Sequence, residues 1–177
     1  MIKKLKIPLA IALGVSLGSS LWIGHAVAAN KTQHSIGSGS VDSKEIRWGS
    51  STKYTANRDY AIKIWNALGK VKIAPDTATT IEDLTFKDVN LPDETFTAQW
   101  VPRIGADRIE FNTPKFNNSG RTTAAKNKTA SHELGHALGI GDHYESNYSG
   151  LIMYGYSSST TTLQAHDKTD YNANWKN

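Results

Sequence analysis

The sequence predicts an α+β domain in which a twisted, mixed five-stranded sheet is accompanied by a backing helix, a long second helix and a C-terminal helix. Short segments that alternate apolar and polar residues are typical of strands, and five of them occur between residues 45 and 111. Two longer stretches, residues 61–68 and 122–138, have apolar residues at helical spacing, and each is followed by a glycine. The predicted order is one strand, one helix, four strands and two further helices.

The first half of the domain supplies three strands and the backing helix. Residues 45–48 and 71–73 are predicted to be strands on either side of that helix, and residues 84–89 follow as a third strand. The helix buries an apolar face between Ala61 and Leu68. The glycine after it suits a helix end, because glycine takes the left-handed backbone of a C-terminal turn at little cost.

The second half supplies two strands and the remaining helices. Residues 95–101 alternate apolar with polar side chains and end at a proline, and residues 108–111 form the fifth strand. The stretch 122–138 is rich in Thr and Ala and contains no proline, so it predicts one long helix. Residues 163–175 predict a closing helix, with two aromatic residues four positions apart that pack on the domain.

The N-terminal segments are predicted to lie outside the fold. Residues 1–29 have a lysine-rich start, a long apolar run and small residues at the end, which predicts a signal segment cleaved after Ala28 or Ala29. The apolar run is long for a signal, so a retained membrane anchor is the alternative. Residues 30–44 are polar and glycine-rich and predict a flexible arm, and residues 45–177 predict the folded domain.

Composition and charge limit the class of protein. The chain has no cysteine, so a secreted domain of about 148 residues must be stabilised by its core and not by disulfides. Its formal net charge is +4, of which three charges come from lysines in the signal segment, leaving +1 for the rest. This near balance argues against nucleic acid as a partner. We expect a monomer, secreted or held at the cell surface, without stable membrane association once the signal is cleaved.

The most informative motif is His132-Glu133-Leu134-Gly135-His136. Two histidines four positions apart lie one above the other on one face of a helix, where both imidazoles can bind a single metal ion, usually zinc. Glu133 projects beside that ion, as expected of a general base that takes a proton from a zinc-activated water. The motif therefore predicts a zinc-dependent peptidase with one catalytic Zn2+.

A third ligand is expected after Gly139, whose left-handed turn would bring the chain back toward the histidine pair. Asp142 and His143 follow about three residues later. Position in the motif favours Asp142 as the third ligand, whereas the softer imidazole nitrogen favours His143. We predict Asp142 as the metal ligand, with His143 as the alternative third ligand or as a neighbour that orients a ligand.

These residues resemble the motif of the metzincin metallopeptidases, in which a zinc-binding helix, a glycine turn, a third ligand and a Met-turn follow one another. Most metzincins have histidine as the third ligand, whereas Asp142-His143-Tyr144 looks like the motif of the snapalysin family; a carboxylate also completes a zinc site. The order of elements resembles the matrixin catalytic domain. The resemblance implies a metzincin-type fold, with a fourth strand at the sheet edge that binds substrate as an added strand.

Residues 151–156 resemble a Met-turn. The resemblance implies that Met153 lies beneath the metal site as an apolar floor and is not a ligand. Tyr156 falls where some metzincins place a tyrosine that steadies the tetrahedral intermediate, and the alternative is an aromatic side chain in the pocket wall. The polar residues 157–162 would then wall the pocket for the residue that follows the scissile bond.

Other ions and residues are given smaller roles. Matrixins hold a structural zinc with histidines ahead of the zinc-binding helix, but this chain has no histidine or cysteine between His34 and His132, so one zinc is predicted. Calcium binding is left as an alternative: Asp107 and scattered carboxylates offer oxygen ligands, but they form no dense pattern in any loop. His166 is expected on the surface of the closing helix, without a part in catalysis.

Together these observations predict a secreted zinc metalloendopeptidase that hydrolyses peptide bonds in protein or peptide substrates. Two alternatives use the same fold. A zinc-dependent amidase acting on cell-wall peptides would keep the metal site. A non-catalytic secreted binding domain would have lost turnover, although Glu133 is intact.

Overall fold

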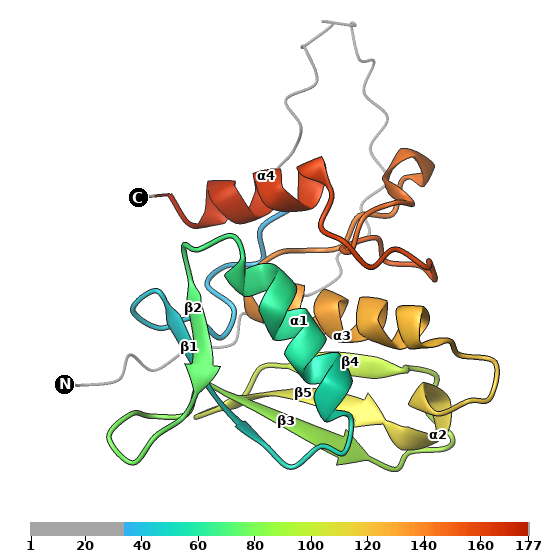
Figure 1. Cartoon of the computed structure of the whole chain (residues 1–177), viewed down its shortest axis with the longest axis horizontal. Coiled ribbons are helices and arrows are strands. Elements are labelled where there is room, and N and C mark those ends of the chain that lie inside the picture. Colours follow the sequence, from blue (N-terminus) through green and yellow to red (C-terminus); the bar gives the residue numbers. More distant parts are fainter. Residues whose placement is uncertain (1–33, 177) are drawn as a thin grey trace, which may run out of the picture. The chain divides into compact units, whose positions relative to one another are not determined.

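Residues 34–176, the part of the chain that a computed structural model describes, begin with a strand and a helix, continue with four strands and end with helices (Figure 1). The strands are β1 (Glu45–Ser50), β2 (Lys72–Pro75), β3 (Leu84–Val89), β4 (Ala98–Val101) and β5 (Asp107–Asn112). The helices are α1 (Thr55–Asn66), α2 (Thr113–Phe116), α3 (Thr123–Ala137), the 3-10 helix η1 (Ser146–Tyr148) and α4 (Ala165–Asn174). The predicted α+β class and the order of the longer elements are confirmed. α2 and η1 were not predicted, because three or four residues are too few to show a helical period.

The sheet is mixed, and its strand order is β2-β1-β3-β5-β4. β1 pairs in parallel with β2 and β3, and β3 pairs in parallel with β5. Only β4 runs antiparallel, with Gln99 opposite Glu110 on β5. Because β4 is the last strand in this order, it is an edge strand, as expected, and one side of its backbone faces away from the sheet.

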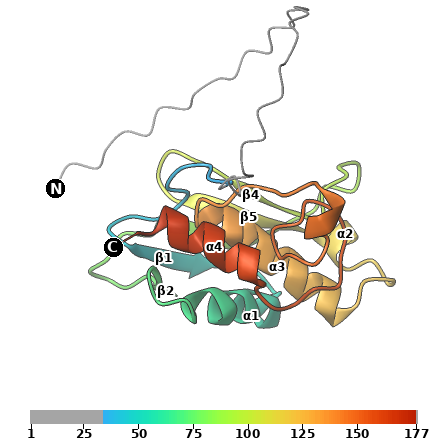
Figure 2. The ribbon, with the colours of Figure 1, turned by 90° about the horizontal axis from the view of Figure 1, so that it is seen from above.

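The core lies between the sheet and the two helices α1 and α3, which pack side by side along it (Figure 2). Phe86 on β3 and Ile109 on β5 are fully buried in one apolar cluster with Trp65 of α1 and Leu134 of α3. The Trp65 indole Nε1 also donates a hydrogen bond to the backbone oxygen of Ser131, 2.8 Å away. This contact fixes α3 against α1 and so sets the position of the histidine motif.

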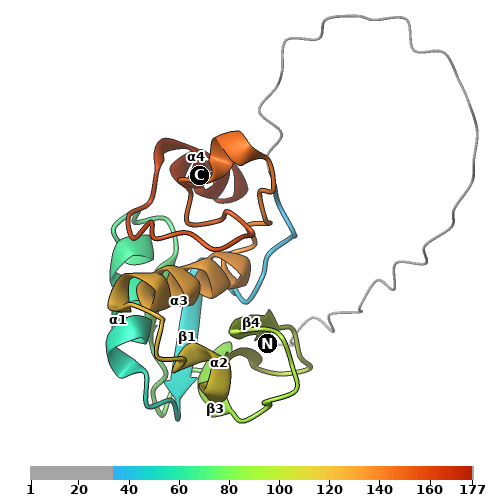
Figure 3. The same cartoon turned by 90° about the vertical axis from the view of Figure 1, so that its right-hand side faces the viewer.

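The closing helix α4 covers the other side of α3 from the sheet (Figure 3). Tyr171 is fully buried against Trp65, and its hydroxyl accepts hydrogen bonds from the backbone N–H groups of Lys70 and Val71. Trp175, one turn later, donates from its indole to the backbone oxygen of Leu138. The prediction that both aromatic residues pack on the domain is confirmed.

Residues 34–44, which we expected to belong to a flexible arm, pack on the domain. The backbone N–H of Ile36 donates to Gly139, and that of Ser40 donates to Ala137, so this segment follows the end of α3. Ser40 and Val41 are buried, and the Ser40 hydroxyl donates to Asp107 on β5. The composition was misleading because these contacts use backbone groups and one small side chain. Residues 30–33 lie outside the described part.

Within residues 34–176, none of the helices combines the length and apolar character needed to cross a bilayer. The predicted signal segment, residues 1–29, lies outside the described residues.

Candidate metal centre

Helix α3 brings His132 and His136 together. Thr122 begins the helix as its N-cap, with its side chain accepting a hydrogen bond from the backbone N–H of Ala125. The two histidines are one turn apart, and their Nε2 atoms lie 3.1 Å from each other. Both rings therefore direct the same nitrogen to one point above the helix, as the sequence predicted.

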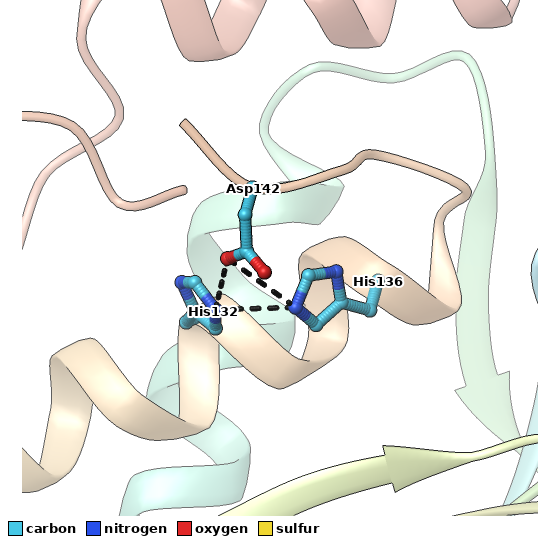
Figure 4. Close-up of side chains that lie close together, drawn as sticks. All are labelled: His132, His136 and Asp142. Carbon is cyan, nitrogen blue, oxygen red and sulfur yellow. Dashed lines mark hydrogen bonds and ion pairs between the residues drawn. The ribbon is translucent and has the colours of Figure 1, made fainter. Parts of the chain in front are cut away.

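The turn after α3 brings Asp142 to the same point (Figure 4). Gly139 has a φ of +79°, in the left-handed region that side chains other than glycine seldom adopt. After this turn, Asp142 Oδ1 lies 3.0 Å from His132 Nε2 and 3.7 Å from His136 Nε2. The three predicted residues thus form one group of side chains that could hold a metal ion.

Hydrogen bonds to the backbone orient both imidazoles. His132 Nδ1 lies 2.9 Å from the backbone oxygen of Ile152, and His136 Nδ1 lies 2.8 Å from that of Ile140. A carbonyl oxygen only accepts, so each Nδ1 donates its N–H, and in the neutral form of either imidazole the lone pair is then on Nε2. Such partners fix the tautomer and direction of metal-binding histidines.

The spacing of the three atoms fits a small divalent ion. In a tetrahedral site with zinc–ligand distances of about 2.0–2.1 Å, neighbouring ligand atoms lie about 3.3–3.4 Å apart. The observed separations of 3.0, 3.1 and 3.7 Å lie on both sides of this value. Asp142 Oδ1 is also buried without a hydrogen-bond partner among the described residues, which is costly for a carboxylate oxygen that binds nothing.

The protonation states of His136 and Asp142 also suit a metal. Burial lowers the pKa of His136 to about 4, so its ring is neutral near pH 7. Burial acts to raise the pKa of Asp142, but the neighbouring His132 and His136 outweigh burial, and the pKa falls to about 2. A neutral imidazole and an ionised carboxylate are the forms that bind metals.

Glu133 lies beside the group in a buried position between α3 and the sheet edge. One carboxylate oxygen, Oε2, accepts a hydrogen bond of 2.8 Å from the backbone N–H of Trp100 on β4. Burial raises the pKa of Glu133 to about 7, although the neighbouring His132 and the Trp100 N–H oppose the rise. A carboxyl with this pKa can both accept and return a proton near neutral pH.

Met153 lies directly under α3, and Tyr156 does not reach the metal group. Met153 is fully buried, and a Cβ placed on Gly135 would lie 2.2 Å from its sulfur. This position beneath the helix is the one expected for an apolar floor. Tyr156 is 58% exposed and its ring packs against those of Tyr144 and Tyr154, so it forms part of the outer wall.

His143 points away from the histidine pair and belongs to a second buried group. Its Nε2 lies 2.7 Å from Asp170 Oδ2 on α4, and His166 Nε2 lies 3.6 Å from the same oxygen. The expectation that His166 is a surface residue is wrong, because its side chain packs between the rings of His143 and Tyr148. This group of two histidines and one aspartate could also hold a metal ion.

A pocket of about 170 Å3 adjoins Glu133 and His132, and two of its basic residues were not singled out from the sequence. Lys128 and Arg121 line it together with residues of β4 and of the segment 155–158. Lys128 is buried, which lowers the pKa of its ammonium to about 8. Helical spacing in the sequence could have indicated Lys128, because it precedes His132 by four positions and so lies on the same helical face.

Comparison with known proteins adds information on the fold alone. No family model and no curated protein matches this chain. Among solved structures, one chain of the GM1-bound form of the ECX AB5 holotoxin matches with a TM-score of 0.54 and 12% sequence identity. The match covers 75% of this chain and 81% of that chain. At this identity the likeness shows a related arrangement of helices and strands and carries no information about activity.

Proposed function

We propose that this protein is a secreted zinc metalloendopeptidase with a metzincin-like catalytic domain. The observation that carries the proposal is the group of His132, His136 and Asp142, whose ligand atoms converge beside the buried carboxylate of Glu133. The mixed sheet, with an antiparallel edge strand next to the histidine-bearing helix, is compatible with that domain.

The three convergent side chains would hold the zinc ion. When bound, zinc polarises the scissile carbonyl and makes a water molecule acidic enough to lose a proton near neutral pH. Glu133 is the residue that accepts this proton and later returns it to the leaving amine. The Trp100 N–H holds the carboxylate in place, because it donates to Oε2 and leaves Oε1, which has no hydrogen bond within residues 34–176, to take up the proton.

The edge strand β4 is the proposed binding surface for the substrate backbone. It has a neighbouring strand on one side only, so an extended peptide can pair with the other side through main-chain hydrogen bonds to groups other than the Trp100 N–H, which donates to Glu133. These bonds do not depend on side chains, which suits an enzyme that cleaves within proteins. Because Glu133 contacts β4 through Trp100, a peptide on this edge runs past the proton acceptor.

The test compares casein cleavage by the wild-type protein with that by Glu133→Gln and Glu94→Gln. Glutamine keeps the shape of Glu133 and can still accept the Trp100 N–H, but it cannot take up a proton. We expect cleavage to stop with a zinc chelator, to return when zinc is added, and to fall by about 100-fold or more in Glu133→Gln. Glu94 is exposed, so Glu94→Gln should keep full activity.

Zinc content has to be measured in each variant, since loss of the metal would also abolish cleavage. Equal zinc in the wild type and in Glu133→Gln assigns the loss to the missing base. Cleavage that survives either the chelator or Glu133→Gln would overturn the proposal. Zinc-loaded protein that cleaves no protein or peptide would also overturn it.

A further inference from the structure

The pocket beside Glu133 lies where a substrate side chain would enter. It is bounded by Ala98 at the edge strand β4, by the first turns of α3, and by Ser158 in the segment that follows Met153. In the proposed reaction, Glu133 returns its proton to the leaving amine, so it faces the residue that contributes this amine. The pocket shares Glu133 as a wall. It therefore receives the side chain that follows the scissile bond.

Two cations line this pocket, and neither pairs with a carboxylate within residues 34–176. Lys128 Nζ donates to the backbone oxygens of Tyr154 and Tyr156, at 2.6 and 3.3 Å, and so fixes the wall segment to α3. Arg121 Nη2 donates to Thr129 Oγ1 at 2.6 Å, which turns the guanidinium along the pocket side of α3. With Glu133 ionised, these two cations leave a formal charge of +1 on the pocket lining.

Buried hydrogen-bonding groups at the pocket also lack partners. Arg121 Nε and Ser158 Oγ both have no hydrogen-bond partner in the described part of the chain, although both atoms are buried. Leaving such groups unpaired in a buried position is unfavourable. A carboxylate can accept from a guanidinium and from a hydroxyl, and its charge strengthens the bond to the guanidinium, whereas an apolar side chain would leave both groups unpaired.

The pocket is large enough for an acidic side chain. Its volume is about 170 Å3, and an apolar cavity of about 150 Å3 is known to hold benzene, which has more heavy atoms than the side chain of glutamate. Size therefore does not select for a small residue, and charge and hydrogen bonding decide what binds.

We propose that this pocket selects substrates with glutamate or aspartate immediately after the scissile bond, and that Arg121 is the residue that reads the carboxylate. The inference rests on the proposed peptidase function and adds its substrate class. Lys128 contributes positive charge and holds the pocket wall, while Arg121 supplies Nε, the N–H donor without a partner within residues 34–176. Uncharged polar and apolar side chains at the same position would bind less well.

The first experiment measures kcat/KM for two peptides that are identical except for Glu or Gln after the scissile bond. Glutamine has the same shape, so the ratio reports the charge. We expect the wild type to prefer Glu by about 10-fold or more, as for a hydrogen bond between charged groups. In Arg121→Gln the ratio should fall to about one. Arg108→Gln, on β5 outside the pocket, should keep the wild-type ratio.

A second experiment needs no turnover. Isothermal titration calorimetry compares binding of the dipeptide amides Glu-Ala-NH2 and Gln-Ala-NH2, which imitate the amine product, to the zinc-loaded protein. We expect the Glu compound to bind about 10-fold more tightly. Arg121→Lys, which keeps a charge but loses the planar pair of donors, should show an intermediate preference and provides a folded variant if Arg121→Gln is unstable.

The outcomes separate the inference from the function on which it rests. Cleavage of both peptides at equal rates, or a Glu preference that persists in folded Arg121→Gln, overturns the inference and leaves the peptidase standing. Failure to cleave any peptide overturns the proposed function, and the binding experiment then still decides whether the pocket prefers a carboxylate. Equal binding of the two dipeptide amides overturns the inference in that case as well.

Discussion

Gly135 lies between the two histidines of α3, at the point where the helix rests on Met153. A Cβ built on Gly135 would lie 2.2 Å from the Met153 sulfur and 3.1 Å from its terminal methyl carbon. Ordinary contacts between nonbonded heavy atoms are about 3.5–4.0 Å. The substitution Gly135→Ala therefore forces Met153 to move by more than 1 Å, although alanine is the better helix former.

The expected sign of the effect depends on which of two terms is larger. Alanine in a helix interior is more favourable than glycine by about 0.5–1 kcal/mol. Adding a methyl group to a packed core costs about 1–3 kcal/mol, and Met153 is fully buried. We therefore expect Gly135→Ala alone to lower the free energy of unfolding by about 1–2 kcal/mol.

Removing the obstructing side chain should reverse that sign. Met153→Ala alone should cost about 2–5 kcal/mol, because it leaves a cavity under the helix. In this background the Gly135→Ala methyl meets the Trp65 ring, whose Cζ2 lies 3.1 Å away and has to shift by a few tenths of an ångström. The methyl keeps the helix advantage and buries about one methyl group, worth about 0.8 kcal/mol. Gly135→Ala should then stabilise the protein by about 1–2 kcal/mol. The coupling between the two sites is thus about 2–4 kcal/mol.

The assay is a double-mutant cycle of urea unfolding, followed by tryptophan fluorescence in the presence of a chelator. The chelator keeps metal affinity out of the comparison, since a bound metal stabilises the folded state by itself. Equal m-values in the four proteins would show that the same transition is measured. If Gly135→Ala destabilises both backgrounds to the same extent, the helix does not rest on Met153 and the apolar floor inferred here is wrong.

Two further predictions concern the turn and loop that carry Asp142. The Tyr144 hydroxyl donates a hydrogen bond to Asp142 Oδ2 at 2.9 Å. Tyr144→Phe should therefore weaken zinc binding by about 10-fold, measured by competition with a coloured chelator, whereas the control Tyr156→Phe should not. Equal zinc affinities of the two variants would contradict the role of this hydrogen bond. Gly139→Ala should lower the free energy of unfolding by about 1–3 kcal/mol, because φ is +79° and a Cβ would lie 2.1 Å from the backbone oxygen of Gly37. Gly150→Ala, where a Cβ meets nothing within 4 Å, is the matched control for thermal unfolding.

Much of the fold could be predicted because its elements depend on local patterns. The five strands and three longer helices follow from alternation, helical spacing and glycine at helix ends. The position of β4 at the sheet edge could not be derived from such patterns, because strand order depends on contacts between distant residues. It came from the resemblance to matrixins, and the structure has β4 at the edge.

The errors arose where distant contacts override composition. The polar side chain of His166 on a short helix indicated a surface position. In the structure its ring packs against His143 and Tyr148, which lie in the segment before Met153. The arm residues 34–44 lack apolar periodicity, yet their backbone groups pair with the end of α3. Arg121 and Lys128 were not singled out, because helical spacing places Lys128 on the face of His132 but does not show that the segment after Met153 folds over both residues.

The choice between Asp142 and His143 shows how a local ambiguity is resolved by its surroundings. Adjacent residues of an extended segment point in opposite directions, so one of the two must face away from the histidine pair. His143 is held by its own backbone: its N–H donates to Met153 and its carbonyl accepts from Gly155, which ties the loop to the Met153 segment. Its side chain then meets Asp170 on α4. With His143 fixed on that side, Asp142 is left facing His132 and His136. The second buried group therefore anchors the loop that supplies the third side chain of the candidate metal centre.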